Sequence, residues 1–72
     1  MISHIETNDL IRIANAGGGF ELSATGRDIN DIIRIANAAG GKGRIELTSV
    51  DHFGVNDLIR IANAGKGSVF FK

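Results

Sequence analysis

The chain carries one ten-residue motif three times. The first copy reads Asn8-Asp9-Leu10-Ile11-Arg12-Ile13-Ala14-Asn15-Ala16-Gly17, and the motif returns at residues 30–39 and 56–65 with only Leu/Ile and Gly/Ala exchanges. The copies recur within the ~20–50 residue spacing of repeat architectures. Each is followed by a glycine cluster and a short strand-like segment. The sequence therefore predicts three tandem units, each made of a helix, a glycine turn and a strand.

The motif has the periodicity of a half-buried helix. On a helical wheel its apolar positions share one side, and its Asn and Arg positions lie opposite. This predicts helices over residues 8–17, 30–39 and 56–65, with Asn8 as the N-cap of the first and Asp9 favouring the positive end of its dipole. Gly17 is expected to end that helix, because glycine readily adopts positive φ.

The segments after the glycine clusters predict strands with two different faces. One face carries Phe20, Leu22, Ile45, Leu47, Val69 and Phe71, and the other carries Glu21, Glu46 and Phe70. Strands joined through a helix are expected to be parallel, with right-handed crossovers. The predicted fold class is therefore α/β, with three tandem helix-strand repeats forming a small parallel sheet that has helices on one face. The predicted core joins Leu10, Ile13, Ile32, Ile35, Leu58 and Ile61 to Leu22, Ile45, Leu47 and Val69.

The predicted units fill most of the chain, which is interpreted as a single repeat domain over residues 1–72. The units cover about residues 8–26, 30–52 and 56–72, after a lead-in over residues 1–7 whose first six residues are compatible with one further strand. A unit of one helix and one strand resembles a leucine-rich repeat in general form. The L-x-x-L-x-L pattern of that family is absent, so no family is assigned.

Size and charge limit what such a chain can do. It has 72 residues, and a domain of that length buries only about 60% of the surface that its unfolded chain exposes. It has no Cys, so no disulfide can support the small core, and self-association is the expected support. Its formal net charge is zero, which disfavours broad binding to nucleic acid or anionic lipid. Neither a signal peptide nor a membrane-spanning run is predicted, and a cytoplasmic location is expected.

The last predicted strand differs from the other two. Phe70 stands where the first two strands have Glu21 and Glu46. An exposed strand with adjacent aromatic residues is prone to aggregate in a monomer. We therefore expect a homodimer related by a two-fold axis, formed through Val69, Phe70 and Phe71. The alternative is that residues 1–5 fold over Phe70 within one chain.

A strip of polar residues is predicted on the outer helix faces, formed by Arg12, Arg34, Arg60, Asn15, Asn37 and Asn63. With Lys42, Arg44 and Lys66 it could bind an anion, a phosphate backbone or an acidic partner. The simpler interpretation is that each Arg pairs with the Asp three residues before it, and that the Asn side chains bind neighbouring loops.

The remaining polar groups give little indication of chemistry. The glycine clusters, including Gly65-Lys66-Gly67-Ser68, follow helices, whereas a phosphate-binding loop precedes one. His4 and His52 are expected in surface loops too far apart to share a metal ion, although Glu6 and Asp51 lie nearby in the sequence. Glu21 and Glu46 are expected side by side, either as solvated carboxylates or as an acid of raised pKa.

The most strongly indicated function is a small structural or protein-interaction module that associates with itself. No serine has a His and an Asp placed beside it by any pattern, so the chain is not predicted to be an enzyme, and no cofactor or metal is expected. The alternative function is weak binding of nucleic acid or another anion through the Arg strip. These two differ in salt dependence, because phosphate binding weakens steeply with added salt.

Overall fold

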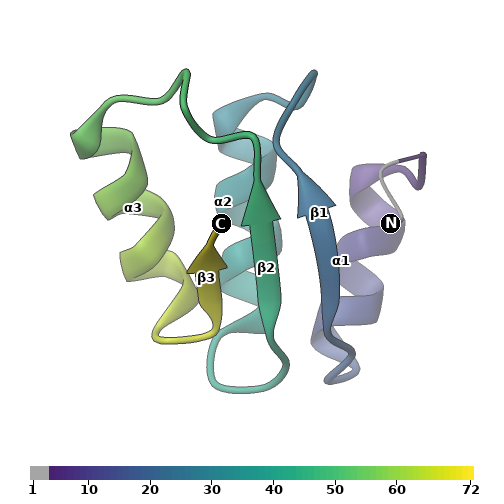
Figure 1. Ribbon diagram of the computed structural model, residues 1–72. Helices are drawn as coiled ribbons and strands as arrows, with labels where there is room; N and C mark the ends of the chain where they lie inside the picture. Colours follow the sequence, from purple (N-terminus) through teal and green to yellow (C-terminus); the bar gives the residue numbers. More distant parts are fainter. Residues whose placement is uncertain (1–3) are drawn as a thin grey trace.

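The computed structural model describes residues 4–72 and has three helices alternating with the three strands of a parallel sheet. The elements are α1 (Thr7–Asn15), β1 (Phe20–Ser23), α2 (Ile29–Ala39), β2 (Ile45–Thr48), α3 (Val55–Gly65) and β3 (Val69–Phe71). The strands lie in the order β1-β2-β3, so neighbours in sequence are neighbours in the sheet (Figure 1). The predicted α/β class is confirmed.

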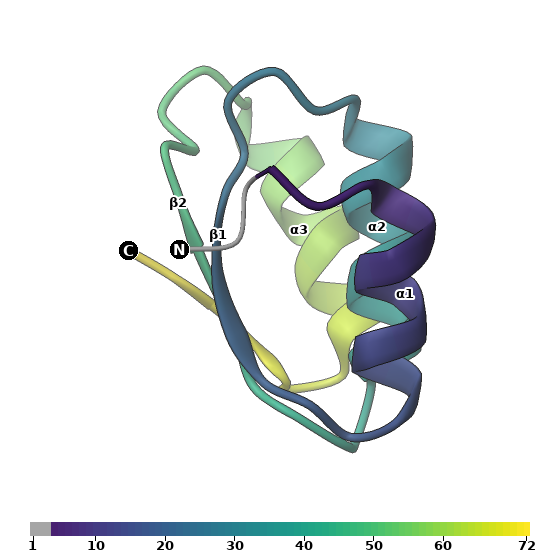
Figure 2. The same cartoon turned by 90° about the vertical axis from the view of Figure 1, so that its right-hand side faces the viewer.

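The three helices all cover the same face of the sheet, and the other face is open (Figure 2). Viewed from the open side with the strands pointing up, β1, β2 and β3 run from right to left in front of the helices (Figure 1). Each strand-helix-strand connection is therefore right-handed, as expected for parallel strands. The helices pack in order, α1 on α2 and α2 on α3.

The helices begin and end close to the predicted residues, but the predicted N-cap is wrong. Asn8 lies inside the first turn of α1, and Glu6 occupies the N-cap with extended backbone and no side-chain cap hydrogen bond. Asp28 and Gly54 hold the same position in α2 and α3. The motif thus starts at the second helical residue of each helix. At the other end of α1, Gly17 has φ +92° and ends the helix as predicted.

The core lies between the helices and the sheet, with Leu10, Leu22, Ile35, Ile45, Leu47 and Ile61 as its largest fully buried side chains. Alternate strand positions face it, since Phe20 pairs with Ile45 and Leu22 with Leu47 in register. Five predicted core or core-facing residues differ from expectation. Ile13 and Phe71 are 37% and 39% exposed, and Phe20, Leu58 and Val69 are half-buried. All five belong to the first or last unit, which has a neighbouring unit on one side only.

The glycine loops that join helices to strands touch one another. A Cβ on Gly43 would lie 2.5 Å from the carbonyl oxygen of Gly18, and one on Gly19 would lie 2.8 Å from that of Arg44. The backbone of the first loop therefore packs directly against that of the second, an approach that only glycine permits. The second and third loops are tied by the buried Ser68, whose Oγ accepts a hydrogen bond from the Gly41 N–H at 3.1 Å.

The segment before α1 forms no strand in the part that the structure describes. His4 and Ile5 form a turn and a bend, and residues 1–3 of the predicted extra strand lie outside the described residues. The carbonyl of Ile5 accepts a hydrogen bond from Arg27 Nη2 at 2.6 Å, and its side chain packs against the core. Among the described residues, no helix has the length and apolar character needed to cross a bilayer.

Candidate interaction surfaces

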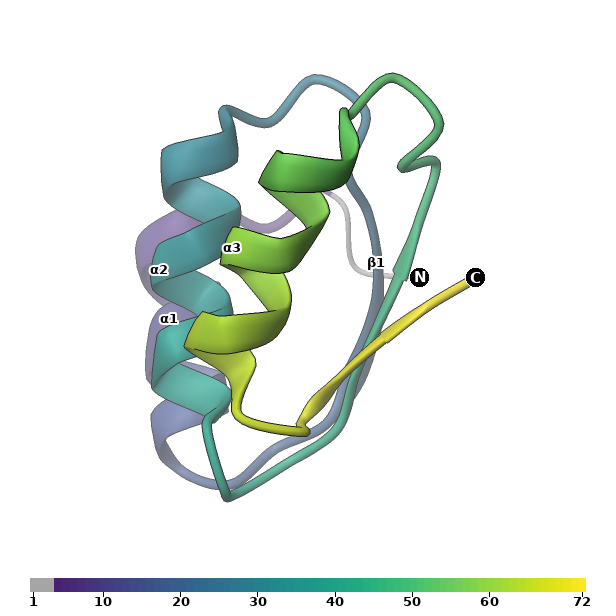
Figure 3. The ribbon, with the colours of Figure 1, turned by 90° about the vertical axis from the view of Figure 1, so that its left-hand side faces the viewer.

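The C-terminal strand β3 lies at an edge of the sheet, and its aromatic residues are exposed. β3 pairs with β2 only, with Phe70 opposite Glu46 and Phe71 opposite Leu47. Phe70 and Phe71 are about two-fifths exposed, and Val69 is half-buried. Phe71 is uncovered because β3 diverges from α3 toward its end (Figure 3). The residues predicted for self-association are thus partly accessible and continuous along one edge.

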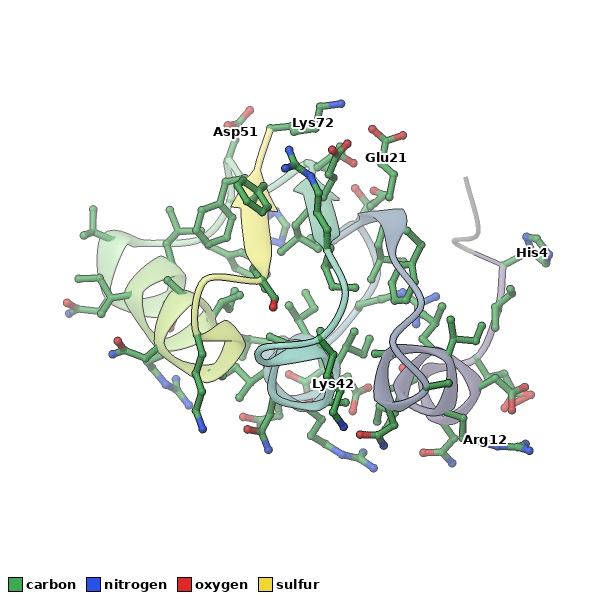
Figure 4. All side chains as sticks on the ribbon, turned by 90° about the horizontal axis from the view of Figure 1, so that it is seen from below. His4, Arg12, Glu21, Lys42, Asp51 and Lys72 are labelled. Carbon is green, nitrogen blue, oxygen red and sulfur yellow. The ribbon has the colours of Figure 1, made fainter. Side chains whose placement is uncertain are left out.

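The ring of Phe70 has a partner within the chain. The guanidinium carbon of Arg44 lies 3.7 Å from the centroid of that ring, an arrangement worth ~0.5–1 kcal/mol at an exposed site. Arg44 therefore covers one side of the ring from the loop before β2. Residues 1–5 were the predicted alternative cover. Of these, His4 lies beyond α1, away from the C-terminal strand (Figure 4).

Helix α3 adds an apolar surface that the sequence analysis did not identify. Val55 and Ile59 are 72% and 51% exposed, and the adjacent Leu58 is half-buried. Val55 and Ile59 are one helical turn apart, so their side chains share a face of α3. Of the five exposed large apolar residues among residues 4–72, four lie on α3 or β3. The third unit therefore carries most of the exposed large apolar residues.

An ion cluster occupies the open face of the sheet. Glu21 and Glu46 lie opposite each other on β1 and β2, and Lys72 Nζ donates to both, at 3.1 Å to Glu21 Oε2 and 3.3 Å to Glu46 Oε1. Arg44 Nε donates to Glu46 Oε2 at 2.9 Å. Figure 4 shows Glu21 and Lys72 together on this side, with Arg12 on the opposite side of the molecule. The predicted pair of neighbouring carboxylates is therefore neutralised by two cations.

The cluster argues against the general-acid interpretation for Glu46. Hydrogen bonds from Arg44 and then Lys72 lower the pKa of Glu46, which is the opposite of the raised pKa that a general acid needs. Hydrogen bonds to Glu21 and Glu46 raise the pKa of Lys72. Both shifts favour the charged forms of Glu46 and Lys72, in keeping with the ion pair between them. The sequence analysis did not predict this cluster because it considered Glu21 and Glu46 without Arg44 and Lys72.

Each arginine of the predicted strip lies beside its own aspartate. Arg12, Arg34 and Arg60 approach Asp9, Asp31 and Asp57 at 3.5 Å in all three helices. Arg34 Nη2 also donates to Asn8 Oδ1 of α1 at 3.5 Å, so the strip crosses from helix to helix. Asn15, Asn37 and Asn63 are exposed on the same helices. The ion pairs of the simpler interpretation account for the geometry of the arginines. The binding of neighbouring loops by the Asn side chains stays a prediction.

The glycine loops and histidines show no arrangement for an anion or a metal. The three glycine clusters follow α1, α2 and α3 and precede strands, so the negative ends of the helix dipoles point toward them. His52 packs on Phe53, with ring centroids 4.1 Å apart. Across residues 4–72, no group of three or more His, Cys, Asp or Glu side chains could hold a metal ion.

Comparison with known proteins does not assign a role to these surfaces. No protein-family model, curated protein or solved structure matches the chain. Function is therefore inferred from the exposed groups of this molecule, and four of the five exposed large apolar residues among residues 4–72 lie on α3 or β3.

Proposed function

We propose that this chain is a small structural or protein-interaction module of three helix-strand repeats, and that it associates with copies of itself through its C-terminal unit. The observation that carries the proposal is the concentration of exposed apolar residues there: Val55, Ile59, Phe70 and Phe71. Clustered apolar side chains on a small domain typically mark an interaction site. Charge is balanced over the whole chain, so long-range repulsion between copies is small.

The free edge of β3 supports the same proposal. Within the described residues, β3 has a neighbour on one side only. Natural proteins usually cover or pair such an edge. A two-fold axis would set Phe70 against its copy, as the sequence predicts, and apolar surface buried in this way contributes ~25 cal/mol per Å².

Sedimentation of the parent and of Phe70→Glu tests this function. The parent is expected to form species larger than one chain at low micromolar concentration. Phe70→Glu replaces the ring by the residue type found at the register position of β2, adds a charge to the apolar end, and is expected to remain folded with a smaller average mass. Thr25→Glu, in the exposed loop after β1, adds the same charge elsewhere and should keep the parent mass. A parent that sediments as a single chain at all concentrations would overturn the proposal.

A further inference from the structure

Each helix has one flank that contacts the preceding helix and one that contacts the following helix. The first helix exposes one of these flanks, and the last helix exposes the other. The arginine position of the motif faces the preceding helix in α2, where Arg34 donates a hydrogen bond to Asn8 of α1. Other positions face the following helix: a Cβ on Gly65 of α3 would lie 3.8 Å from Cβ of Ala36 in α2. A first helix therefore lacks cover on one flank, and a last helix lacks cover on the other.

The N-terminal flank shows this in three successive comparisons. Ile13 is 37% exposed, whereas its equivalents Ile35 and Ile61 are at most 1% exposed. The side chain of Arg12 is 83% exposed, against 58% and 56% for the two later arginines. The side chain of Asp9 is 58% exposed, against 37% and 39% for the later aspartates. In α2 and α3, the preceding helix covers these three motif positions. In α1 the same positions are more exposed.

The C-terminal flank shows the complementary pattern. Ile59 is half exposed, whereas Ile11 and Ile33, at the same motif position, are partly buried against the core. Ala62 is exposed, whereas Ala14 and Ala36 are fully buried. These are the positions that the next helix covers in the first two units. Helix α3 thus offers the same surface that α1 offers to α2 and α2 offers to α3, but no segment of residues 4–72 occupies it.

We propose that the partner of the C-terminal end is the N-terminal end of a second copy, so that copies associate head to tail. In this arrangement α3 of one copy packs on α1 of the next as α2 packs on α3, and Ile59 enters the shallow groove lined by Asp9, Arg12, Ile13 and Ala16. Asn56 then faces Arg12 of the next copy, repeating the bond between Asn8 and Arg34. The inference rests on the proposed self-association and names the second surface that takes part in it.

The sheet allows the same continuation. β1 and β3 are the two outer strands and are parallel to β2, in register along Phe20, Ile45 and Val69. A second copy placed head to tail would set its β1 beside β3 in the parallel orientation that the sheet already has. A two-fold axis perpendicular to the sheet would instead pair β3 with an antiparallel copy of itself. Among the residues that the structure describes, β1 and β3 are each paired on one side only. Of the two arrangements, the head-to-tail one uses both of these strands, and it produces open stacks or closed rings rather than a fixed dimer.

Complementary variants distinguish the two arrangements. Ile13→Glu places a carboxylate on the N-terminal end only, and Ile59→Glu places one on the C-terminal end only. If association is head to tail, each variant alone sediments as a single chain. An equimolar mixture forms a species of two chains and none larger, because one intact end of each kind remains. The two altered ends both carry carboxylates and repel each other. Thr25→Glu is the matched control and assembles like the parent.

The other possible results overturn either the head-to-tail inference or the proposed self-association. If Ile13→Glu keeps the parent mass while Ile59→Glu is a single chain, the arrangement is two-fold and the head-to-tail inference is wrong, although the proposed function survives. If the mixture remains single chains, the inference is wrong as well. A parent that never associates overturns both. Should Ile13→Glu fail to give a helical circular dichroism spectrum, Ala16→Glu with Val55→Glu provides a second pair at exposed positions, with the same expected outcomes.

Discussion

The central and C-terminal units carry nearly the same residues in different surroundings. Ile32 and Ala36 of α2 are buried, whereas Leu58 and Ala62 at the same positions of α3 are half-buried and exposed. On the strands, Leu47 is buried and Phe71 is exposed. The motif is nearly unchanged between these units. At these positions, burial therefore depends on whether a further unit follows.

The comparison separates what a residue contributes to folding from what it offers to a partner. An apolar side chain between two units contributes to the stability of one chain, because its surface is removed from water on folding. The same side chain on an outer unit contributes less to folding and leaves apolar surface available for association. Three nearly identical motifs thus provide both a core and two unlike ends.

The largest expected effect comes from truncating one motif position in two units. Ile35→Ala removes a fully buried side chain and is expected to lower the free energy of unfolding by ~2–5 kcal/mol. Ile61→Ala should fall in the same range, since Ile61 is equally buried. Ile13→Ala, on the uncovered flank of α1, should cost about 1 kcal/mol or less, as is usual for partly exposed sites.

Urea titrations measure these three losses. They are made at one low protein concentration, because association raises the apparent stability. Equal losses at Ile13 and Ile35 would contradict the proposed role of neighbouring units.

The fold was predictable from the sequence because its signals are local and repeated. Helical periodicity predicted α1, α2 and α3 to within about two residues, and alternation predicted which side of β1 and β2 faces the helices. The errors have physical reasons. Asn8 suits a cap by residue type, yet the helix begins one residue before it. Ile13 matches Ile35 in sequence, so only the missing neighbour explains its exposure.

The candidate surfaces were less predictable because they depend on contacts between units. Phe70 was predicted to take part in self-association because it stands where the other two strands have Glu. The apolar flank of α3 could have been found by asking which motif positions lack a following helix. The pairing of Lys72 with Glu21 and Glu46 depends on residues far apart in the chain, and spacing alone does not indicate it.

The second prediction concerns the open sheet face, where the first two strands differ from the third. The folded-state pKa of Glu46 is lowered from the ordinary 4.5, so its contribution to stability is present above that pH. The contribution is lost as pH falls through the lower folded-state pKa. The pKa of Lys72 is raised from 10.5, so its contribution is present below that pH and is lost as pH rises through the higher value. The ion pairs therefore stabilise the fold fully between these two limits.

Lys72→Met tests this window. The variant is expected to unfold at lower urea concentration than the parent at pH 7, with a difference that shrinks in acid below the ordinary pKa of Glu46, 4.5. Lys42→Met is the matched control, since Lys42 lies on the helix side of the molecule (Figure 4). A difference that stays constant down to strong acid would show that the carboxylates do not respond to Lys72.

The smallest expected effect is on the helix face, where all three units are alike in carrying an Arg beside an Asp. Each side chain of Arg12, Arg34 and Arg60 is more than half exposed, and pairs of this spacing contribute only ~0.2–0.5 kcal/mol each before screening by salt. Changing all three residues to Gln should therefore lower the stability by about 1 kcal/mol or less.

The same triple variant decides the alternative function, and its expected result is no change. The chain has no net positive charge, and each Arg has an Asp 3.5 Å away. Few cations are therefore free to contact phosphates and release their counterions, which is the main source of affinity for nucleic acid. Anisotropy titrations with mixed DNA and RNA fragments at physiological salt should detect no binding by either protein. Micromolar binding by the parent that weakens steeply with salt and disappears in the variant would make the Arg strip a nucleic-acid site.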